Sequence, residues 1–323
     1  MSLTVVAYTP EHAALWDAWC ANAGNATFLH SRKFLSYHDY RFDDCSVLFF
    51  DSGQLVGVMP AARDQHDPHR VVSHPGATYG GIVHQGWLLG ARIIEAFYLL
   101  KLHYQNLGYT KLLYKPLPYI YAQTPSQDDL YALFRHGAQR LRCDLSSTID
   151  LSARRVVSER RQRGLKKSMK LVALTADNAL LDSFWGVLTD NLARKHDAEP
   201  VHTRNELAIL IARFPEQIQL RCATIKGCVE AGVILFNSTN VWHAQYIAAS
   251  EKGYAASALD AIFAAILDEA KIAGARYFDF GISNEAGGWV LNEGLYRFKS
   301  EFGGGGVVYD FFELDLGGEQ SAA

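Results

Sequence analysis

A concentration of positive charge lies near the middle of the chain, where residues 152–170 include eight basic residues and one acidic residue. Guanidinium and ammonium groups are well suited to binding phosphate. If this segment forms a helix, it presents a group of cations to a ligand: Arg160, Arg161, Arg163, Lys166 and Lys167. The functional interpretation is a phosphate-binding helix, and the alternative is a solvated helix face with no ligand.

Two carboxylates lie where a predicted strand ends and a loop begins: Asp279 is near the strand end and Glu285 is in the loop. Loops that follow strands often carry binding and catalytic residues. A carboxylate in such a loop can accept the proton that an attacking amine must lose. Both residues are therefore candidate general bases, and an equal alternative for Asp279 is a structural role beneath the loop.

Other catalytic patterns are not found in the sequence. The twelve histidines show no HExxH-like spacing and the five cysteines are scattered, so no metal site is expected. No serine lies in a GxSxG motif, and the glycine run 303–306 lacks the Lys and Ser or Thr that follow in a P-loop. Direct transfer without a covalent enzyme intermediate is the expected chemistry.

The elements that carry these residues follow a duplicated order. Residues 46–62 predict a β-hairpin, followed by an amphipathic helix over 88–106 and a strand over 110–115. Residues 220–250 repeat the hairpin design and precede a helical stripe and a strand over 275–281. This order predicts an α/β (α+β mixed) fold with two tandem domains, 1–150 and 151–323, each with a mixed twisted sheet flanked by helices.

Composition limits the classes of partner. The formal net charge is −3, so nothing global attracts DNA or an anionic membrane, and any polyanion site must be local. We expect no integral membrane segment, since no apolar run approaches the length of a membrane span. The odd, scattered cysteines favour a reducing compartment, and a cytoplasmic location is expected.

The end of the chain resembles FemABX-type transferases and the GNAT-like acetyltransferase domain of polysaccharide gene clusters. The likeness rests on a Tyr-Asp-Phe-Gly-like strand end, a loop, and Phe-Lys followed shortly by Phe-Gly. In this chain these are Phe278 to Gly281, Phe298 with Lys299, and Phe302 with Gly303. The basic segment resembles the Arg- and Lys-rich helix of the family, and the run that begins at Tyr79 is the clearest local likeness in the first half.

The resemblance implies two tandem GNAT-like domains and assigns roles to several residues. Lys299, preceded by Phe298, would lie in the active cleft, where it would bind acceptor phosphate or stabilise the oxyanion of the tetrahedral intermediate. Tyr246 would position a substrate group, although a half-buried strand position is an alternative for Tyr246 and equally for His243. Tyr79 is a further candidate binding residue.

A turn that holds coenzyme A pyrophosphate in GNAT proteins corresponds here to residues 250–257. Gly253 and Ala255 match the glycine-rich pattern, whereas Ser250 replaces the usual Gln or Arg. Backbone amides at a helix start would hold the phosphates. The alternative is an ordinary turn in which Gly253 supplies a positive backbone angle.

The leading hypothesis is therefore an N-acyltransferase that moves an acetyl or aminoacyl group onto an amine of a sugar nucleotide, polysaccharide precursor or peptidoglycan precursor. Arg161, Arg163 and Lys167 would contact phosphate. The donor is expected to be acetyl-CoA or another acyl-CoA, with aminoacyl-tRNA possible but not favoured, because tRNA needs a broad basic surface. The rival hypothesis is a catalytically silent GNAT-like module that binds a phosphorylated sugar or a partner protein.

Overall fold

The computed structural model describes residues 3–196 and 199–317 and divides into two compact units. The first unit contains the described residues up to Asp144, the segment Ala286–Trp289 and the described residues from Val308 onward. The second contains Leu145–Glu285 and Val290–Val307. The sequence predicted a single boundary at residue 150, which assigns the last strand, Gly305–Asp315, to the second domain. In the structure most of this strand belongs to the first unit.

The first unit begins with a three-stranded antiparallel sheet in the order β1-β2-β3. The predicted hairpin is confirmed, and its turn places Ser52 and Gly53 at positive φ. A second group of strands follows the order β4-β5-β6-β15. The elements of this unit are β1 (Leu3–Ala7), α1 (Ala13–Asn22), α2 (Arg32–Leu35), β2 (Val47–Asp51), β3 (Gln54–Met59), β4 (Ala62–Arg63), β5 (Arg70–Val72), α3 (Ala91–Asn106), β6 (Lys111–Tyr114) and α4 (Asp128–Arg135), with parts of β7 (Gln139–Asp150) and β15 (Gly305–Asp315).

Helix α3 forms because its apolar residues recur at helical spacing and all reach the same core. Ile93, Phe97, Leu100 and Tyr104 are fully buried and pack with the strands of this unit. The helix ends at Asn106, and Gly108 follows it at φ 85°. The predicted helix and the strand after it are therefore confirmed.

The second unit contains a mixed sheet in the order β7-β12-β11-β10-β9-β8. Strands β11 and β12 are parallel, and the other neighbouring pairs are antiparallel. The elements are α5 (Glu159–Ser168), β8 (Ala173–Thr175), α6 (Leu181–His196), α7 (Arg204–Arg213), β9 (Ile218–Ile225), β10 (Cys228–Asn237), β11 (Val241–Ala249), α8 (Glu251–Ala255), α9 (Ala258–Ile272), β12 (Tyr277–Ile282), β13 (Asn284–Glu285), β14 (Val290–Leu291) and α10 (Glu293–Ser300).

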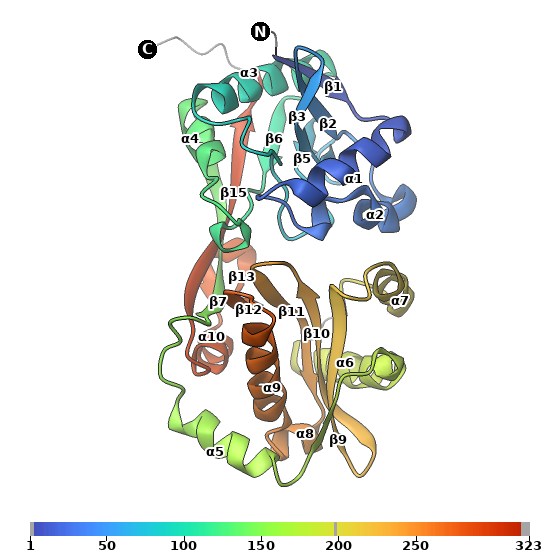
Figure 1. The fold of residues 1–323 in the computed structure, drawn as a ribbon, viewed down its shortest axis with the longest axis vertical. Coiled ribbons are helices and arrows are strands. Elements are labelled where there is room, and N and C mark those ends of the chain that lie inside the picture. Colours follow the sequence, from blue (N-terminus) through green and yellow to red (C-terminus); the bar gives the residue numbers. More distant parts are fainter. Residues whose placement is uncertain (1–2, 197–198, 318–323) are drawn as a thin grey trace. The chain divides into compact units, whose positions relative to one another are not determined.

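Helices cover both faces of this sheet, as Figure 1 shows for α9 and α6. Strand β10 is buried on both faces, because successive side chains of a strand point to opposite sides of the sheet and each side is covered by a helix. Ala231 and Val233 join the core formed with Ile262 of α9. Gly232, between them, faces the other way, and Phe184 of α6 packs directly against it. The predicted class of mixed α/β units is confirmed.

Candidate active site

Lys299 lies on α10 and is almost completely buried, with 4% of its surface exposed. Its Nζ donates hydrogen bonds to the carbonyl oxygens of Gly281 at 2.9 Å and Ile282 at 2.6 Å, at the end of β12. Burial lowers the pKa of Lys299 to about 8, and the nearby Asp279 carboxylate acts in the opposite direction. The side chain is thus an ammonium below that pH, and two of its three protons are held by the backbone.

Asp279 lies in the sheet interior with no exposed surface. Its Oδ1 accepts hydrogen bonds from the hydroxyls of Ser146 and Thr148 on β7. Its Oδ2 is 2.7 Å from Nδ1 of His243 on β11. The carboxylate is therefore enclosed and cannot itself meet a substrate, but it holds an imidazole that reaches the surface, with 13% of the side chain exposed.

These groups meet where two parallel strands separate. Among the described residues, the ladder between β11 and β12 runs from Val241↔Tyr277 to His243↔Asp279 and ends there. Gly281, two residues further along β12, has φ 78° and lies so close to His243 that an added Cβ would be 3.4 Å from the Cε1 of the imidazole. The carbonyl of the same Gly281 binds Lys299. His243 thus lies beside the glycine whose carbonyl binds Lys299, two residues beyond the last register pair of β11 and β12.

Glu285 supports the helix that carries Lys299. It lies on the short strand β13 and is exposed. Its Oε1 accepts a hydrogen bond from Asn292 Nδ2 at 2.9 Å, and Asn292 caps α10 by accepting from the backbone N–H of Leu295. The geometry makes Glu285 a partner of the helix cap.

Arg161 anchors α5 to both α9 and α10. Its guanidinium pairs with Asp260 and Glu301, each at 3.1 Å, and only 8% of its side chain is exposed. It also stacks on Phe298 and Phe302 at 4.4 Å and 4.8 Å from the ring centres. This packing corrects the prediction that Arg161 contacts a phosphate, because both its charge and its faces are occupied. Phe298 likewise belongs to this aromatic cluster.

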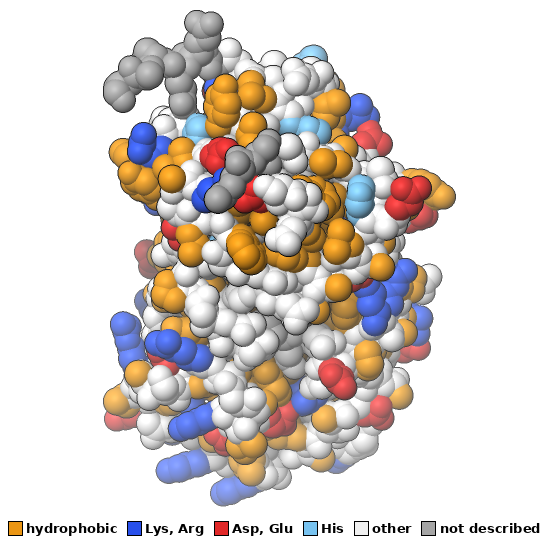
Figure 2. Space-filling view, turned by 45° about the horizontal axis from the view of Figure 1, so that its top comes forward, with side chains coloured by type: hydrophobic (Ala, Val, Ile, Leu, Met, Phe, Trp, Pro, Cys, Tyr) orange, Lys and Arg blue, Asp and Glu red, His pale blue; other side chains and the backbone are white. Residues whose placement is uncertain are grey.

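The other predicted cations of α5 remain in solvent. Arg163 is 75% exposed at its side chain and lies 3.7 Å from Glu159, a separation at which a surface ion pair contributes little. Lys167 is also exposed. Figure 2 shows Lys and Arg side chains projecting at the lower left, the region of α5 in Figure 1. This face is accessible to a phosphate.

The turn before α9 differs from the predicted phosphate cradle. Ser250 accepts a hydrogen bond from the backbone N–H of Gly253 at 3.0 Å and donates to the Glu230 carboxylate. Gly253 is buried, and an added Cβ would lie 2.1 Å from the carbonyl oxygen of Glu230. Ala255 is exposed at the end of the five-residue helix α8. The capped amide and the adjacent carboxylate make this turn unfavourable for an anion.

Tyr246 and Tyr79 each have a partner inside their own unit. The Tyr246 hydroxyl lies 2.7 Å from Nδ1 of His202 and accepts from its backbone N–H, and burial raises the pKa of this phenol to about 12. Tyr79 is buried in the first unit, where its hydroxyl donates to Thr27 Oγ1 at 3.1 Å. Both hydroxyls are structural partners here.

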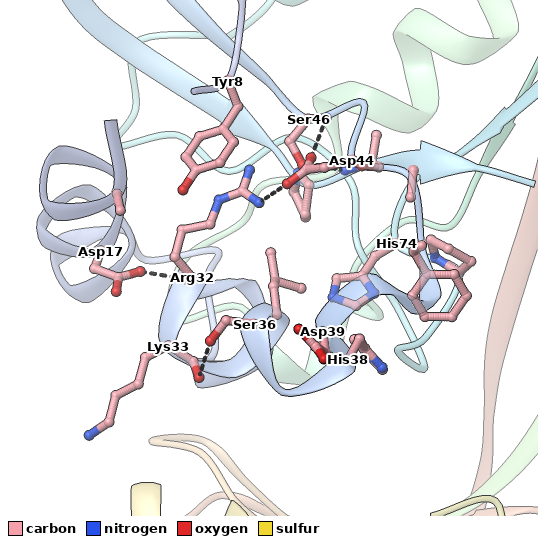
Figure 3. Close-up of a pocket in the computed structure, with 17 residues that line it drawn as sticks. Tyr8, Asp17, Arg32, Lys33, Ser36, His38, Asp39, Asp44, Ser46 and His74 are labelled. Atoms are coloured by element: carbon pink, nitrogen blue, oxygen red, sulfur yellow. Dashed lines mark hydrogen bonds and ion pairs between the residues drawn. The ribbon is translucent and has the colours of Figure 1, made fainter. Parts of the chain in front are cut away.

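A cavity of about 410 Å³ in the first unit was missed by sequence reasoning. Figure 3 shows the Arg32 guanidinium beside the Tyr8 ring and bonded to Asp44, with the ring of His74 also lining the hollow. Ionised and apolar side chains together form its walls, as in many small-molecule sites. Its residues come from α1, α2 and several loops, so no short motif marks it.

The described parts of the chain contain neither a metal-binding group of side chains nor a membrane-spanning helix. Within residues 3–196 and 199–317, no three His, Cys, Asp or Glu side chains are grouped so that they could hold a metal ion. In the same residues no helix combines the length and apolar character needed to span a bilayer.

Comparison with known proteins supports an acyltransferase fold. Residues 152–300 match the model of the acetyltransferase (GNAT) domain. The structure is similar to FemX, with 12% identity, coverage of 98% of this chain and 97% of the other, and a TM-score of 0.68. It is similar to L-PGS from Bacillus licheniformis, with 12% identity, coverage of 96% and 93%, and a TM-score of 0.60.

A third similar structure is the tandem GNAT protein from the clavulanic acid biosynthesis pathway, with 10% identity, coverage of 99% and 100%, and a TM-score of 0.52. No curated protein matches the sequence. At these identities the structural likeness concerns the fold alone.

Proposed function

We propose, from the match of residues 152–300 to the acetyltransferase (GNAT) domain, that the protein is an N-acyltransferase acting on a cell-envelope precursor. The acyl group is acetyl or aminoacyl, and the acceptor is an amine of a sugar nucleotide, polysaccharide precursor or peptidoglycan precursor. The observation that carries the proposal is the buried ammonium of Lys299 at the opening between β11 and β12.

The reaction needs a cation where charge develops on the attacked carbonyl. The acceptor amine forms a C–N bond to the carbonyl carbon, and the carbonyl electrons move onto oxygen. Lys299 can offer its third N–H to that oxyanion, because its other two N–H groups are fixed by Gly281 and Ile282. Collapse of the intermediate breaks the bond to the donor, whose sulfur or oxygen leaves with the electron pair and takes up a proton.

The donor is proposed to be acyl-CoA or aminoacyl-tRNA. The Ser250 turn is unfavourable for a pyrophosphate, since the Glu230 carboxylate already lies there. The exposed cations Arg163 and Lys167 on α5 are the alternative position for donor or acceptor phosphate. The same acidic turn favours the second candidate function, a catalytically silent module that binds a phosphorylated sugar or a partner protein.

The experiment that separates the two functions is a search for product. Purified protein is incubated with acetyl-CoA or with alanyl-tRNA, each combined with amino-sugar nucleotides and with UDP-N-acetylmuramoyl pentapeptide. Mass spectrometry then looks for a new amide. An amide that forms with the protein and not in its absence supports the transferase. Binding of an acceptor with no product in any of the combinations would favour the silent module.

A further inference from the structure

Strands β11 and β12, which separate beside Lys299, also carry an aspartate–histidine pair, of which the sequence pattern assigned a catalytic role to Asp279 alone. His243 on β11 and Asp279 on β12 are register partners, and they form the last pair before the strands separate. The Nδ1 atom of His243 lies 2.7 Å from Oδ2 of Asp279. Since a buried carboxylate is an acceptor, the ring proton belongs on Nδ1 and the lone pair on Nε2.

We propose that His243 Nε2 is the general base that removes the proton from the attacking amine, with Asp279 as the residue that positions it. The inference rests on the proposed acyltransferase function and names the group which that function still lacks. Asp279 and Glu285 were the predicted bases, but Asp279 is enclosed and Glu285 binds the α10 cap.

The surroundings of Asp279 fit a positioning role. The hydroxyls of Ser146 and Thr148 donate to its Oδ1, which leaves Oδ2 to fix the imidazole. All three side chains that contact this carboxylate through those bonds come from strands of one sheet, so the ring is oriented by rigid elements. A base held in this way loses little freedom when it meets the substrate.

The surroundings of His243 relate its ring to Lys299 through Gly281. The carboxylate that meets the ring is Asp279 of β12, and the register partner of His243 on β10 is the apolar Phe236. The Cε1 atom, which is bonded to both ring nitrogens, packs against Gly281, whose carbonyl holds Lys299. Base and oxyanion donor therefore flank the same backbone segment.

The proton balance closes without a further reactant. As the C–N bond forms, the amine proton moves to His243 Nε2, and the ring becomes an imidazolium paired with the Asp279 carboxylate. When the bond to the donor breaks, the imidazolium returns that proton to the leaving thiolate or alkoxide. His243 thus returns to its starting state at the end of the cycle, ready for the next acceptor amine.

The test uses His243→Ala and His243→Gln in full-length protein, with the donor and acceptor pair that gives product. We expect kcat to fall by about 100-fold or more in both variants. Added imidazole should restore part of the rate in His243→Ala, in proportion to its neutral form, and should not accelerate wild type or His66→Gln, whose exposed histidine lies in the first unit. A rate in His243→Ala within a few-fold of wild type, or the lack of any rescue, would overturn the proposal.

A second measurement needs no substrate and separates failure of this inference from failure of the proposed function. Nitrogen NMR of histidine-labelled protein reports which ring nitrogen carries the proton. We expect the neutral His243 ring to be protonated on Nδ1, and we expect Asp279→Asn to change that tautomer while the fold is kept, as judged by circular dichroism. A proton on Nε2 in wild type would exclude His243 as the base even if acyl transfer is observed.

Discussion

Burial of two lysines gives pH-dependent properties that belong to single residues. Lys299 has a pKa lowered to about 8, chiefly by burial. Lys115 directly follows the last residue of β6. Its pKa is lowered to about 7, chiefly by burial and then by the positive charge of Arg142. The first shift bears on the proposed catalytic role of Lys299 and the second on the stability of the first unit, so the two can be measured separately.

The Lys299 shift predicts an alkaline limit to activity. Only the ammonium form can donate to an oxyanion, so kcat/KM for amide formation should fall as pH rises through about 8. Steady-state rates with the uncatalysed reaction subtracted would show this limb. A value of kcat/KM that keeps rising well past pH 8 would argue against a charged Lys299 in the free enzyme.

The Lys115 shift predicts a stability that rises with pH. Its ammonium donates to the carbonyls of His74 and Ala77 in the interior of the first unit. Above a folded pKa of about 7 the native side chain loses its proton while the unfolded one keeps it up to 10.5, so the unfolded state binds more protons. Relative to Lys115→Met, the wild-type free energy of unfolding should rise by about 2 to 3 kcal/mol over two pH units above 7.

Denaturant unfolding of both proteins across this pH range measures the difference. Loss of the two hydrogen bonds in Lys115→Met shifts its curve by a constant, so the slope carries the result. Lys111→Met, on the same β6 and 46% exposed at its side chain, is the matched control and should run parallel to wild type. Parallel curves for wild type and Lys115→Met would contradict an altered Lys115 pKa.

At the scale of elements, Arg161 joins α5 to α9 and α10 through its ion pairs and its stacking on Phe298. Arg161→Met removes the cation that pairs with the buried Asp260 carboxylate and leaves the half-buried Glu301 with only Arg160 at 3.9 Å, so it should lower the free energy of unfolding by about 3 kcal/mol. Arg163→Met, two residues further along the same helix and mostly exposed, should change it by less than about 0.5 kcal/mol. Chemical denaturation compares the two, and equal effects would refute the anchoring role.

The elements themselves were predictable because their patterns are local. Turn residues at Ser52 and Gly53 and the apolar stripe through Ile93 and Phe97 marked the hairpin and helix of the first unit, and the second unit repeated the order. The sequence predicted that the basic segment presents its cations to a ligand, whereas the side chain of Arg161 is buried against the rest of the unit. Its partners Asp260 and Glu301 are about 100 and 140 residues away in the sequence. Hydrophobic periodicity reports only local structure, so it could not predict these pairs.

At the scale of the whole molecule, the site residues show the same limit. Lys299 was predicted from a local Phe-Lys motif. In the structure its ammonium binds the carbonyls at the end of β12, where β12 separates from β11. His243 lacked any motif, because its partner Asp279 is 36 positions further along the chain and meets it only through parallel pairing. The Ser250 turn was recognised as unusual, but the Glu230 carboxylate that makes it acidic comes from the neighbouring strand β10.

The central claim is that the Lys299 ammonium stabilises the transition state of acyl transfer. The most direct measurement is kcat/KM for amide formation by Lys299→Met, compared with Lys271→Met, which removes an exposed lysine at the end of α9. The account predicts a loss of about 100-fold or more for Lys299→Met and none for Lys271→Met, with both proteins folded. Equal rates in the two variants would contradict it.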